Sequence, residues 1–433
     1  PGALDPGQPH ADLSVEDYVE LISDVGFEVC IVSGEHNRGT PRFPSEMMEP
    51  HPNVENDLLP RFIEQAHAKG IIVLTYYPII YCKPLKPKHP EWLMKFLDDG
   101  RPQEENLGWF CFNSPHRDWL ADYLSDFKNH LDVDGFYFDD TNWGTHEEYP
   151  FTPGCHCSYC EELFRADTGL EIPRKVDFDS MTFKRFVSWR YDKVIDFMHH
   201  LYGEMRRRYP DLILDMNTYF WPSGDWALGH PLGSFRLEEV GSYFFVETFR
   251  SAREPGLVSK ILQSTGTPFG VFRNVTQSLE GFGAAPYMEP HTPGIFSMTS
   301  IAHGGAPCGA PFGGQTIVQR EHQKSVFSEL KRRVDYMGGN SLKHAALHYS
   351  TINRDFRPSE REKNTFKTQA WEIGMHDAYG AYEILNRSHV VLDIALDEHL
   401  NAERLSEYSV LFLSNSACLG DDHCEAIRGF VAD

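Results

Sequence analysis

The sequence has few positive charges, no long hydrophobic run, and no repeated or low-complexity tract. Its 433 residues contain 40 Lys and Arg against 63 Asp and Glu, which gives a formal net charge of −23. A protein of that charge repels nucleic acid at long range, so we expect no nucleic-acid partner. No apolar run reaches the roughly 18 residues that a membrane-spanning helix needs, so we expect no membrane partner either.

A recognisable secretion signal is also missing from the first residues. The segment "PGALDPGQPHADL" has neither a positively charged stretch nor an apolar one. This absence leaves a cytoplasmic or a periplasmic location open. Neutral carbohydrate is compatible with the acidic charge and with an aromatic content of 13%, because aromatic rings stack on sugars and carboxylates accept hydrogen bonds from hydroxyls.

Cysteine is present in an odd number, nine, and three of the nine are crowded together. Cys155, Cys157 and Cys160 form the stretch "CHCSYC", which is too tight for ordinary disulfides among themselves. Such spacing indicates a thiolate metal site in a reducing compartment. A closed tetrahedral zinc site needs a fourth ligand, and Cys111, just before a predicted helix, is our candidate.

Four thiolates leave no open coordination position, so zinc bound by them would have a structural role and would join two loops. Two alternatives stay open at this point. His156 or His146 is the fourth ligand in one of them, and in the other these cysteines are reduced and bind no metal. The sequence suggests no organic cofactor.

Short apolar runs rich in Val, Ile, Phe and Tyr alternate with helical patterns, which is typical of a parallel sheet covered by helices. This pattern predicts a (β/α)8 TIM barrel over residues 1–340. A helical pattern, "SVEDYVELISDVG", precedes the first visible strand, so we expect the barrel's first strand to lie upstream of Pro1. The predicted strands cover residues 27–34, 71–78, 133–139, 212–218, 241–247, 267–274 and 294–303.

Residues 341–433 repeat the alternation on a smaller scale. The segments "AALHYS", "SHVVLDIAL" and "YSVLFLSNSACL" are predicted strands, and helical patterns lie between and after them. We therefore expect a small flavodoxin-like α/β domain, which stops where another strand would follow.

Two adjacent carboxylates end the predicted strand in "GFYFDDTNWG". In a parallel barrel the carboxyl ends of the strands carry the chemistry. Strand alternation sends Asp139 and Asp140 to opposite sides, so one of them faces the barrel mouth. A lone Asp here would more often order a loop or cap a helix.

Other predicted strand ends are polar or aromatic as well, and together they resemble a pocket for a pyranose sugar. We expect sugar contacts from Glu35, His36, Tyr76, Asp139, Trp143, Asn217 and His303.

Glycoside hydrolysis needs two carboxyl groups, and Asp140 and Glu247 are the pair that we predict. Both end strands from different parts of the barrel, with Asp140 as nucleophile and Glu247 as acid/base. A retaining enzyme would hold the two carboxyls about 5–5.5 Å apart. The remaining candidates for the acid are Glu35, Glu238, Glu239, Glu280 and Glu289.

Several segments resemble the α-L-fucosidases of glycoside hydrolase family 29. "SGEHNRGTPRFPS" is similar to their "AKHHDGF...WPS" segment, and "DVDGFYFDDTNW" to their "D.lWfDg.w" strand. The resemblance implies that Asp140 is the nucleophile and that His36 contacts the sugar. Glu35 stands where that family has the first histidine of a pair.

Other segments resemble the β-galactosidases of family 42. "FCFNSP" and "CHCSYC" are similar to their zinc-binding cysteines, which implies structural zinc on Cys111, Cys155, Cys157 and Cys160. The stretch from "GAYEILNRSHVVLD" to the end resembles the start of their trimerisation domain, which implies a homo-oligomer, a trimer or a dimer. This combination is most similar to the group called hypothetical glycosyl hydrolase 6.

The sequence thus predicts a retaining exo-glycoside hydrolase that acts on an α-L-fucoside or a galactoside-like sugar. Two alternatives remain. One is a non-catalytic carbohydrate-binding barrel that has lost its acid, and the other is a metal-dependent hydrolase that uses histidines.

Overall fold

The fold is described from a computed structural model of the 433-residue chain. It describes residues 14–36, 39–54, 57–95, 109–139, 143, 155–175, 177, 179–218, 241–247, 254–272, 277–278, 281–284, 292–308, 317–337, 339–356 and 376–432. Among these residues, no helix is long and apolar enough to cross a membrane.

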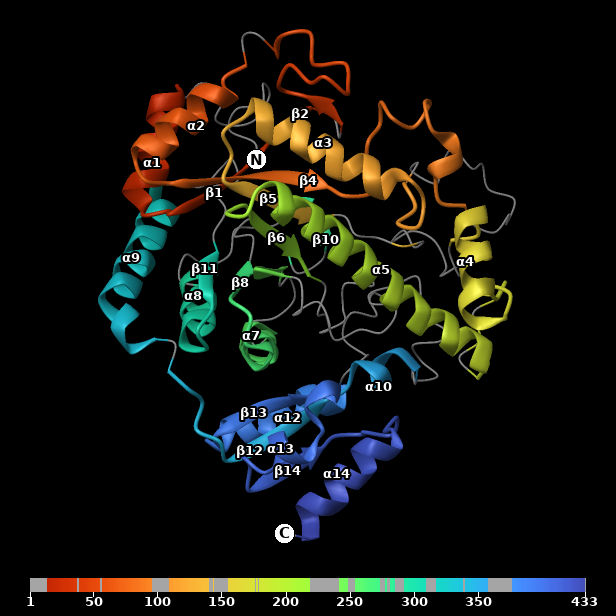
Figure 1. The fold of residues 1–433 in the computed structure, drawn as a ribbon. Helices are drawn as coiled ribbons and strands as arrows, with labels where there is room; N and C mark the ends of the chain where they lie inside the picture. The colour runs from red at the N-terminus through yellow and green to blue at the C-terminus, as the bar shows by residue number, and fades with distance from the viewer. Residues whose placement is uncertain are drawn as a thin grey trace.

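The larger part of the molecule is built on a curled parallel sheet that forms a half-barrel (Figure 1). Its seven strands follow the order β1-β4-β5-β6-β7-β8-β11, so each strand pairs with the next one along the chain, small hairpins aside. The strands are β1 (Val29–Ser33), β4 (Ile72–Pro78), β5 (Gly135–Asp139), β6 (Ile213–Asn217), β7 (Tyr243–Glu247), β8 (Phe269–Phe272) and β11 (Ala306–Cys308).

Helices cover the outer face of this sheet, as a (β/α)8 barrel requires. They are α1 (Val15–Val25), α2 (Leu59–Ala68), α3 (His116–His130), α4 (Ser158–Thr168), α5 (Met181–Arg208), α7 (Glu254–Thr265), α8 (Thr292–Ala302) and α9 (Ile317–Arg333). Local sequence sets their ends. The Ser14 side chain accepts a hydrogen bond from the Asp17 N–H and caps α1, and Gly26, in the left-handed region at φ 101°, ends it.

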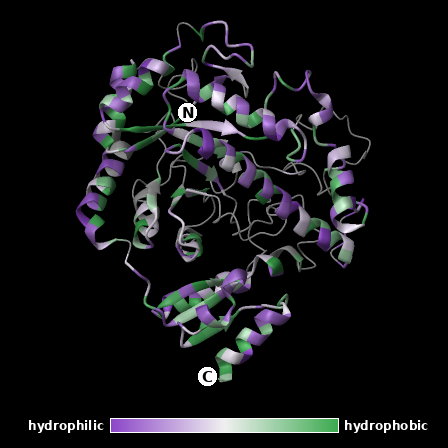
Figure 2. Ribbon diagram, viewed as in Figure 1, coloured by the Kyte–Doolittle hydropathy of each residue, from purple (hydrophilic) through white to green (hydrophobic). Residues whose placement is uncertain are grey.

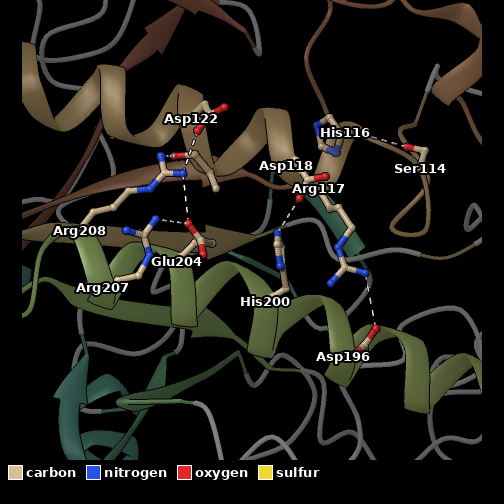
Figure 3. Close-up of polar contacts among 11 residues, drawn as sticks. Ser114, His116, Arg117, Asp118, Asp122, Asp196, His200, Glu204, Arg207 and Arg208 are labelled. Carbon is tan, nitrogen blue, oxygen red and sulfur yellow. Dashed lines mark hydrogen bonds and ion pairs between the residues drawn. The ribbon is translucent and has the colours of Figure 1, made fainter.

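The longest helix, α5, lies beside α3, and charged side chains line the contact between them (Figure 3). His200 and Asp118 are 2.8 Å apart, and Arg208 lies 2.8 Å from Asp122. The two aspartates are more than half exposed, so these ion pairs contribute little to stability. The buried aromatic and aliphatic side chains underneath therefore hold the helices on the sheet.

Alternation along β5 separates the inside of the half-barrel from its outside. Phe136 packs edge-on against Phe127 of α3, with ring centroids 5.5 Å apart, so it faces the helices. Tyr137 packs instead against Phe245 of β7 at 5.1 Å, across the inner face of the sheet. Because side chains alternate along a strand, Asp139 belongs to the inner face with Tyr137.

One predicted strand is wrong. Residues 294–303 were expected to be extended, but Thr292–Ala302 form helix α8, and the strand follows at β11. A short apolar run does not distinguish a strand from a buried helix, and Pro293 in the first turn favours a helix. His303 therefore follows a helix and precedes a strand, which puts it at the amino ends of the parallel strands.

A second, smaller sheet follows at the end of the chain, with the parallel strand order β13-β12-β14. Its strands are β12 (Ala345–Tyr349), β13 (Leu392–Leu396) and β14 (Val410–Leu413), and its helices are α10 (Thr351–Phe356), α12 (His376–Arg387), α13 (Ala402–Leu405) and α14 (Asp421–Ala432). Figure 2 shows that hydrophobic residues gather in these strands, whereas hydrophobic and hydrophilic residues alternate along the helices.

The small sheet contacts the half-barrel through β13 and α7. Asp393 of β13 is buried there and accepts hydrogen bonds from Lys343 at 3.0 Å and from the Tyr408 hydroxyl at 3.2 Å. Lys260 of α7 approaches the same carboxylate at 3.5 Å. One buried aspartate thus joins the two sheets.

Candidate active site and metal centre

The inner face of the half-barrel carries a layer of polar and aromatic residues. Strand pairing aligns Tyr76 with Tyr137, Tyr137 with Asp215, and Asp215 with Tyr243, so these four belong to one level of the sheet. Tyr76, Tyr243, Cys308 and Ile31 pack against Tyr137 and Phe245. Gly270, which pairs with Phe245, leaves room for this layer, because an added Cβ would lie 2.1 Å from the Tyr243 hydroxyl oxygen.

One level closer to the carboxyl ends, the structure brings together two predicted site residues. The Asn217 side-chain N–H donates a hydrogen bond of 3.1 Å to Asp139 Oδ1. Asn217 is 1% exposed, and its Oδ1 has no hydrogen-bond partner among the described residues. The pair therefore offers a carboxylate and an unused amide acceptor at the edge of the sheet where barrel enzymes bind ligands.

The two predicted catalytic carboxyls lie at the limits of what is described. Asp140 directly follows β5 and lies outside the described residues. Glu247 ends β7, where its backbone pairs with Phe272 of β8, and its side chain is outside the described part. Four of the other candidates for the acid, Glu238, Glu239, Glu280 and Glu289, also lie outside it.

Asp215 belongs to this inner face and was missed by the sequence analysis. It lies two residues before Asn217 on β6 and is 3% exposed. Burial raises its pKa well above the ordinary range, which favours the protonated, uncharged carboxyl group. The available signal was an aspartate in the middle of the apolar strand "LILDMNT", where a charge would be costly.

The Glu35 side chain lies on the outer side of the sheet, toward helix α3. The Tyr123 hydroxyl of α3 donates a hydrogen bond of 2.8 Å to Glu35 Oε1. The side chain is buried, and this burial raises the pKa of the carboxyl to about 8, although the bond from Tyr123 lowers it. Glu35 is therefore neutral at pH 7 and supports the hairpin that carries His36.

A pH-dependent stability is expected from Glu35. Its pKa rises from 4.5 in the unfolded chain to about 8 in the folded one, so its stabilising contribution is complete below pH 4.5 and lost as the pH approaches 8. Glu35→Gln keeps the neutral shape and should remove a slope of about 1.4 kcal/mol per pH unit. Urea unfolding between pH 5 and 8 measures this.

Tyr123→Phe is the matched control, because it removes the hydrogen bond and leaves the acid in place. It should lower stability and keep the slope. Parallel stability curves for wild type and Glu35→Gln would contradict a buried neutral carboxyl at this position.

His36 lies in the short hairpin formed by β2 (Glu35–His36) and β3 (Thr40–Pro41), directly after β1. Its ring lies against that of His51, with centroids 4.2 Å apart and the ring planes tilted by 35°. The hairpin is fixed by Arg42, which is buried and makes a two-pronged ion pair with Asp57 at 2.8 and 2.9 Å. This arrangement holds His36 beside the carboxyl end of β1.

Two of the predicted sugar contacts lie away from Asp139 and Asn217. Trp143 is fully buried, with its ring 5.4 Å from that of Phe112 and 5.9 Å from that of Trp189. His303 lies at the opposite, amino-terminal edge of the sheet, for the reason given above. Burial and then the nearby Lys260 lower its pKa to about 4.

The four predicted cysteine ligands form one cluster. Cys111 lies before α3, Cys155 and Cys157 lie before α4, and Cys160 is in the first turn of α4; all four are buried. Their sulfurs all lie within 4.8 Å of one another, and Cys111 Sγ is 3.3 Å from Cys160 Sγ and 3.6 Å from Cys157 Sγ. This spacing fits tetrahedral zinc, whose bonds of about 2.3 Å to sulfur imply about 3.8 Å between sulfurs.

Backbone and side-chain donors approach the sulfurs of the cluster, whereas burial raises the pKa values of Cys111 and Cys160. The Lys95 N–H lies 3.2 Å from Cys155 Sγ, and the Asn113 side chain donates to Cys160 Sγ at 3.4 Å. Hydrogen bonds from Cys111 and the other two thiols lower the pKa of Cys157. The neighbouring His156 is buried but lies outside the four-ligand group, and His146 is outside the described residues.

Comparisons with known proteins agree with this fold. Residues 14–140 match the family model described as "Hypothetical glycosyl hydrolase 6", which covers less than half of the chain. No curated protein matches the sequence. At the identities reported below, the likeness to solved structures establishes the fold.

Among solved structures, an α-L-fucosidase isoenzyme from Paenibacillus thiaminolyticus is 19% identical, with a TM-score of 0.70, and is matched by 100% of this chain. This chain spans 61% of the length of that fucosidase. A β-galactosidase from the haloarchaeon Halorubrum lacusprofundi is 14% identical, with a TM-score of 0.70, over 96% of this chain and 69% of that one. A GH42 β-galactosidase from G. stearothermophilus is 15% identical, with a TM-score of 0.69, over 96% and 67%.

Proposed function

We propose that this chain is a retaining exo-glycoside hydrolase, with its active site at the carboxyl ends of the curled parallel sheet. The observation that carries the proposal is the Asp139–Asn217 pair on the inner face at that edge. The glycosyl hydrolase match, which runs from residue 14 to 140, and the fucosidase and galactosidase folds support a glycoside hydrolase.

Asp140 is the proposed nucleophile and Glu247 the proposed acid/base. Asp140 attacks the anomeric carbon while Glu247 gives its proton to the departing glycosidic oxygen. Glu247 then takes a proton from water, and the water oxygen displaces Asp140 and releases the sugar with its original configuration. Asp140 directly follows β5 in the chain and Glu247 ends β7, and these two strands flank β6 in the sheet.

A second assignment within the same mechanism is favoured by one contact. Asp139 lies on the inner face and accepts a hydrogen bond from Asn217, as a nucleophile oriented toward a sugar would. Parallel substitution of the two adjacent aspartates therefore distinguishes the two assignments.

The proposed substrate is an α-L-fucoside, with an α- or β-galactoside second. The inner face offers Tyr76 and Tyr137 for stacking and Asn217 for hydroxyls, and it is well suited to an uncharged sugar. His36, which is held by the Arg42–Asp57 ion pair, would contact the sugar from the end of β1.

Three further features belong to the same proposal. Zinc bound by the four cysteines would join the loops before α3 and α4 and would have no role in the reaction. Residues 341–433 would be a flavodoxin-like domain of the trimerisation type and 1–340 the catalytic barrel, in a trimer or dimer. The proposed location is cytoplasmic or periplasmic: the cytoplasm keeps thiols reduced, and a closed zinc site would also protect them after export.

Among the alternatives, a metal-dependent hydrolase finds no support among the described residues, where the four-cysteine group is the one candidate metal cluster. A non-catalytic sugar-binding barrel differs from an enzyme only in turnover. An assay of glycoside turnover therefore distinguishes the enzyme from the sugar-binding barrel.

Aryl α-L-fucosides, galactosides and arabinosides are offered to the full chain, and release of the aryl alcohol is followed. We expect turnover of one of them, and proton NMR of the first-formed sugar should show retention of configuration. Binding of free sugar by calorimetry without turnover of any glycoside would favour the sugar-binding barrel, and an inverted product would exclude the double displacement.

A further inference from the structure

The small sheet has its own ligand-binding edge, apart from the half-barrel. The chain passes from β12 to β13 on one side and then crosses to β14 on the other. The strand order therefore reverses between β12 and β14. In open parallel sheets, ligands bind at this reversal, outside the carboxyl ends of the strands.

Three side chains with complementary chemistry meet there, one from each strand end. His348 is the fourth residue of β12, Asp397 follows β13, and Ser416 lies in the loop after β14. His348 Nδ1 lies 2.6 Å from Ser416 Oγ, and His348 Nε2 lies 3.1 Å from Asp397 Oδ1. A serine, a histidine and an aspartate thus form a chain of hydrogen bonds in that order.

The histidine is fixed in one orientation. Its side chain is 0% exposed, and both ring nitrogens have a partner. With the proton on Nε2 directed at the carboxylate, the lone pair of Nδ1 faces the Ser416 hydroxyl. His348 is therefore placed to accept the proton of that hydroxyl.

The aspartate is held as an anion. Burial alone would raise the pKa of Asp397, but hydrogen bonds from His348 and from the Ile352 N–H lower it. Its second oxygen also accepts from the Thr351 hydroxyl at 3.2 Å. The carboxylate stabilises the histidinium that forms when Ser416 loses its proton.

The serine lies at a sharp turn on the accessible side of the group. Asn415, directly before it, has φ 53°, in the left-handed region, and Ser416 is half-buried, whereas His348 is fully covered. The next N–H, that of Ala417, is 3.1 Å from Asn353 Oδ1. The N–H after a nucleophile is where a developing oxyanion is stabilised, and a substrate carbonyl would replace the Asn353 oxygen there.

We propose that Ser416, His348 and Asp397 form a second catalytic site, a serine-type triad that hydrolyses carboxylic esters. Ser416 Oγ bonds to the acyl carbon as its proton moves to His348 Nδ1, and the alcohol leaves with that proton. Water then attacks the acyl-serine, its proton passing through His348 to Ser416 Oγ, and the acid is released. This activity goes beyond the proposed glycosidase and does not depend on it.

The neighbouring side chains favour an uncharged ester. Thr351 and Asn353 are neutral, and Asn415 donates a hydrogen bond of 2.7 Å to the acidic Asp377. An anionic acyl or alcohol group would be repelled by Asp377 and Asp397. Small neutral esters such as 4-nitrophenyl acetate are therefore the expected substrates.

The test uses the full chain and a fluorophosphonate probe, which forms a stable bond with activated serines and releases fluoride. Mass spectrometry should find the probe on Ser416. Ser416→Ala and His348→Gln should each lower labelling and 4-nitrophenyl acetate hydrolysis by at least about a hundredfold. Ser414→Ala, two residues earlier in the same loop, is the matched control and should keep both.

A purely structural hydrogen-bond network predicts different results. Wild type and Ser416→Ala would then be labelled equally, or the probe would be found on another serine, and either result overturns the proposal. Because His348→Gln alters a buried group, its folding is checked by circular dichroism, and Ser416→Ala alone suffices for the decision. Glycoside turnover is measured on the same samples, so failure of one activity is not confused with failure of the other.

Discussion

Replacing Asp140 by asparagine is expected to abolish glycoside turnover, with kcat lowered at least about a thousandfold, or ~4 kcal/mol of transition-state stabilisation. The amide keeps the size of the side chain but cannot attack the anomeric carbon, so substrate binding should change little. Steady-state kinetics on the best aryl glycoside measures this, and added azide should restore turnover of Asp140→Gly by taking the place of the missing nucleophile.

Asp139→Asn provides the matched comparison, because it changes the adjacent residue in the same way and alters the carboxylate that accepts a hydrogen bond from Asn217. If Asp140 is the nucleophile, Asp139→Asn keeps measurable activity and azide has no effect on Asp139→Gly. The reverse result, with azide rescue at position 139 and normal turnover in Asp140→Asn, would transfer the nucleophile to Asp139. Full activity in both variants would remove the mechanism.

Removing one ligand from the cysteine cluster is the second change with a large expected effect. In the proposed zinc site, Cys160→Ser would remove one of the four ligands, and structural zinc supplies on the order of 10 kcal/mol to the small domains that depend on it. The half-barrel also has a large apolar core, so we expect a fall in Tm of about 10 °C or more rather than complete unfolding. Scanning calorimetry measures this change.

Cys82→Ala is the control for the cluster, because Cys82 is also buried but lies outside the four ligands. It should cost about 1 kcal/mol and keep the metal. Elemental analysis of the wild type should give one zinc per chain, and of Cys160→Ser much less. Purified wild type without metal, or unchanged stability after chelation, would contradict the structural role.

Short apolar runs between strong helical patterns explain why the strands of the half-barrel other than β11 could be predicted from sequence. In "GFYFDD", Phe136 and Tyr137 go to opposite faces, as the contacts with Phe127 and Phe245 show. Strands flanked by strong helix patterns have this two-residue repeat on a nearly continuous apolar background. The cysteine cluster could also be predicted, because three closely spaced ligands require a fourth, and Cys111 lies shortly before helix α3.

Other parts could not be predicted because one sequence pattern is compatible with more than one local structure. The run "GIFSMTSIAH" is apolar throughout, and only tertiary packing makes residues 292–302 a helix. Asp215 lies in an apolar strand, but its raised pKa depends on neighbours that fold around it from β5 and β7. The Ser416–His348–Asp397 group could not be predicted from sequence for a similar reason, since its members come from the ends of three separate strands.

The level of Tyr76, Tyr137, Asp215 and Tyr243 lies directly beneath Asp139 and Asn217 and fills the inner face with side chains. Among the described residues these side chains leave a long polymer no route through the half-barrel, so in the proposed glycosidase a bound sugar would depart by the side on which it arrived. Each departing monosaccharide then blocks the entry of the next chain end until it diffuses away. The free sugar should accordingly compete with the substrate, and hydrolysis should slow as the product accumulates.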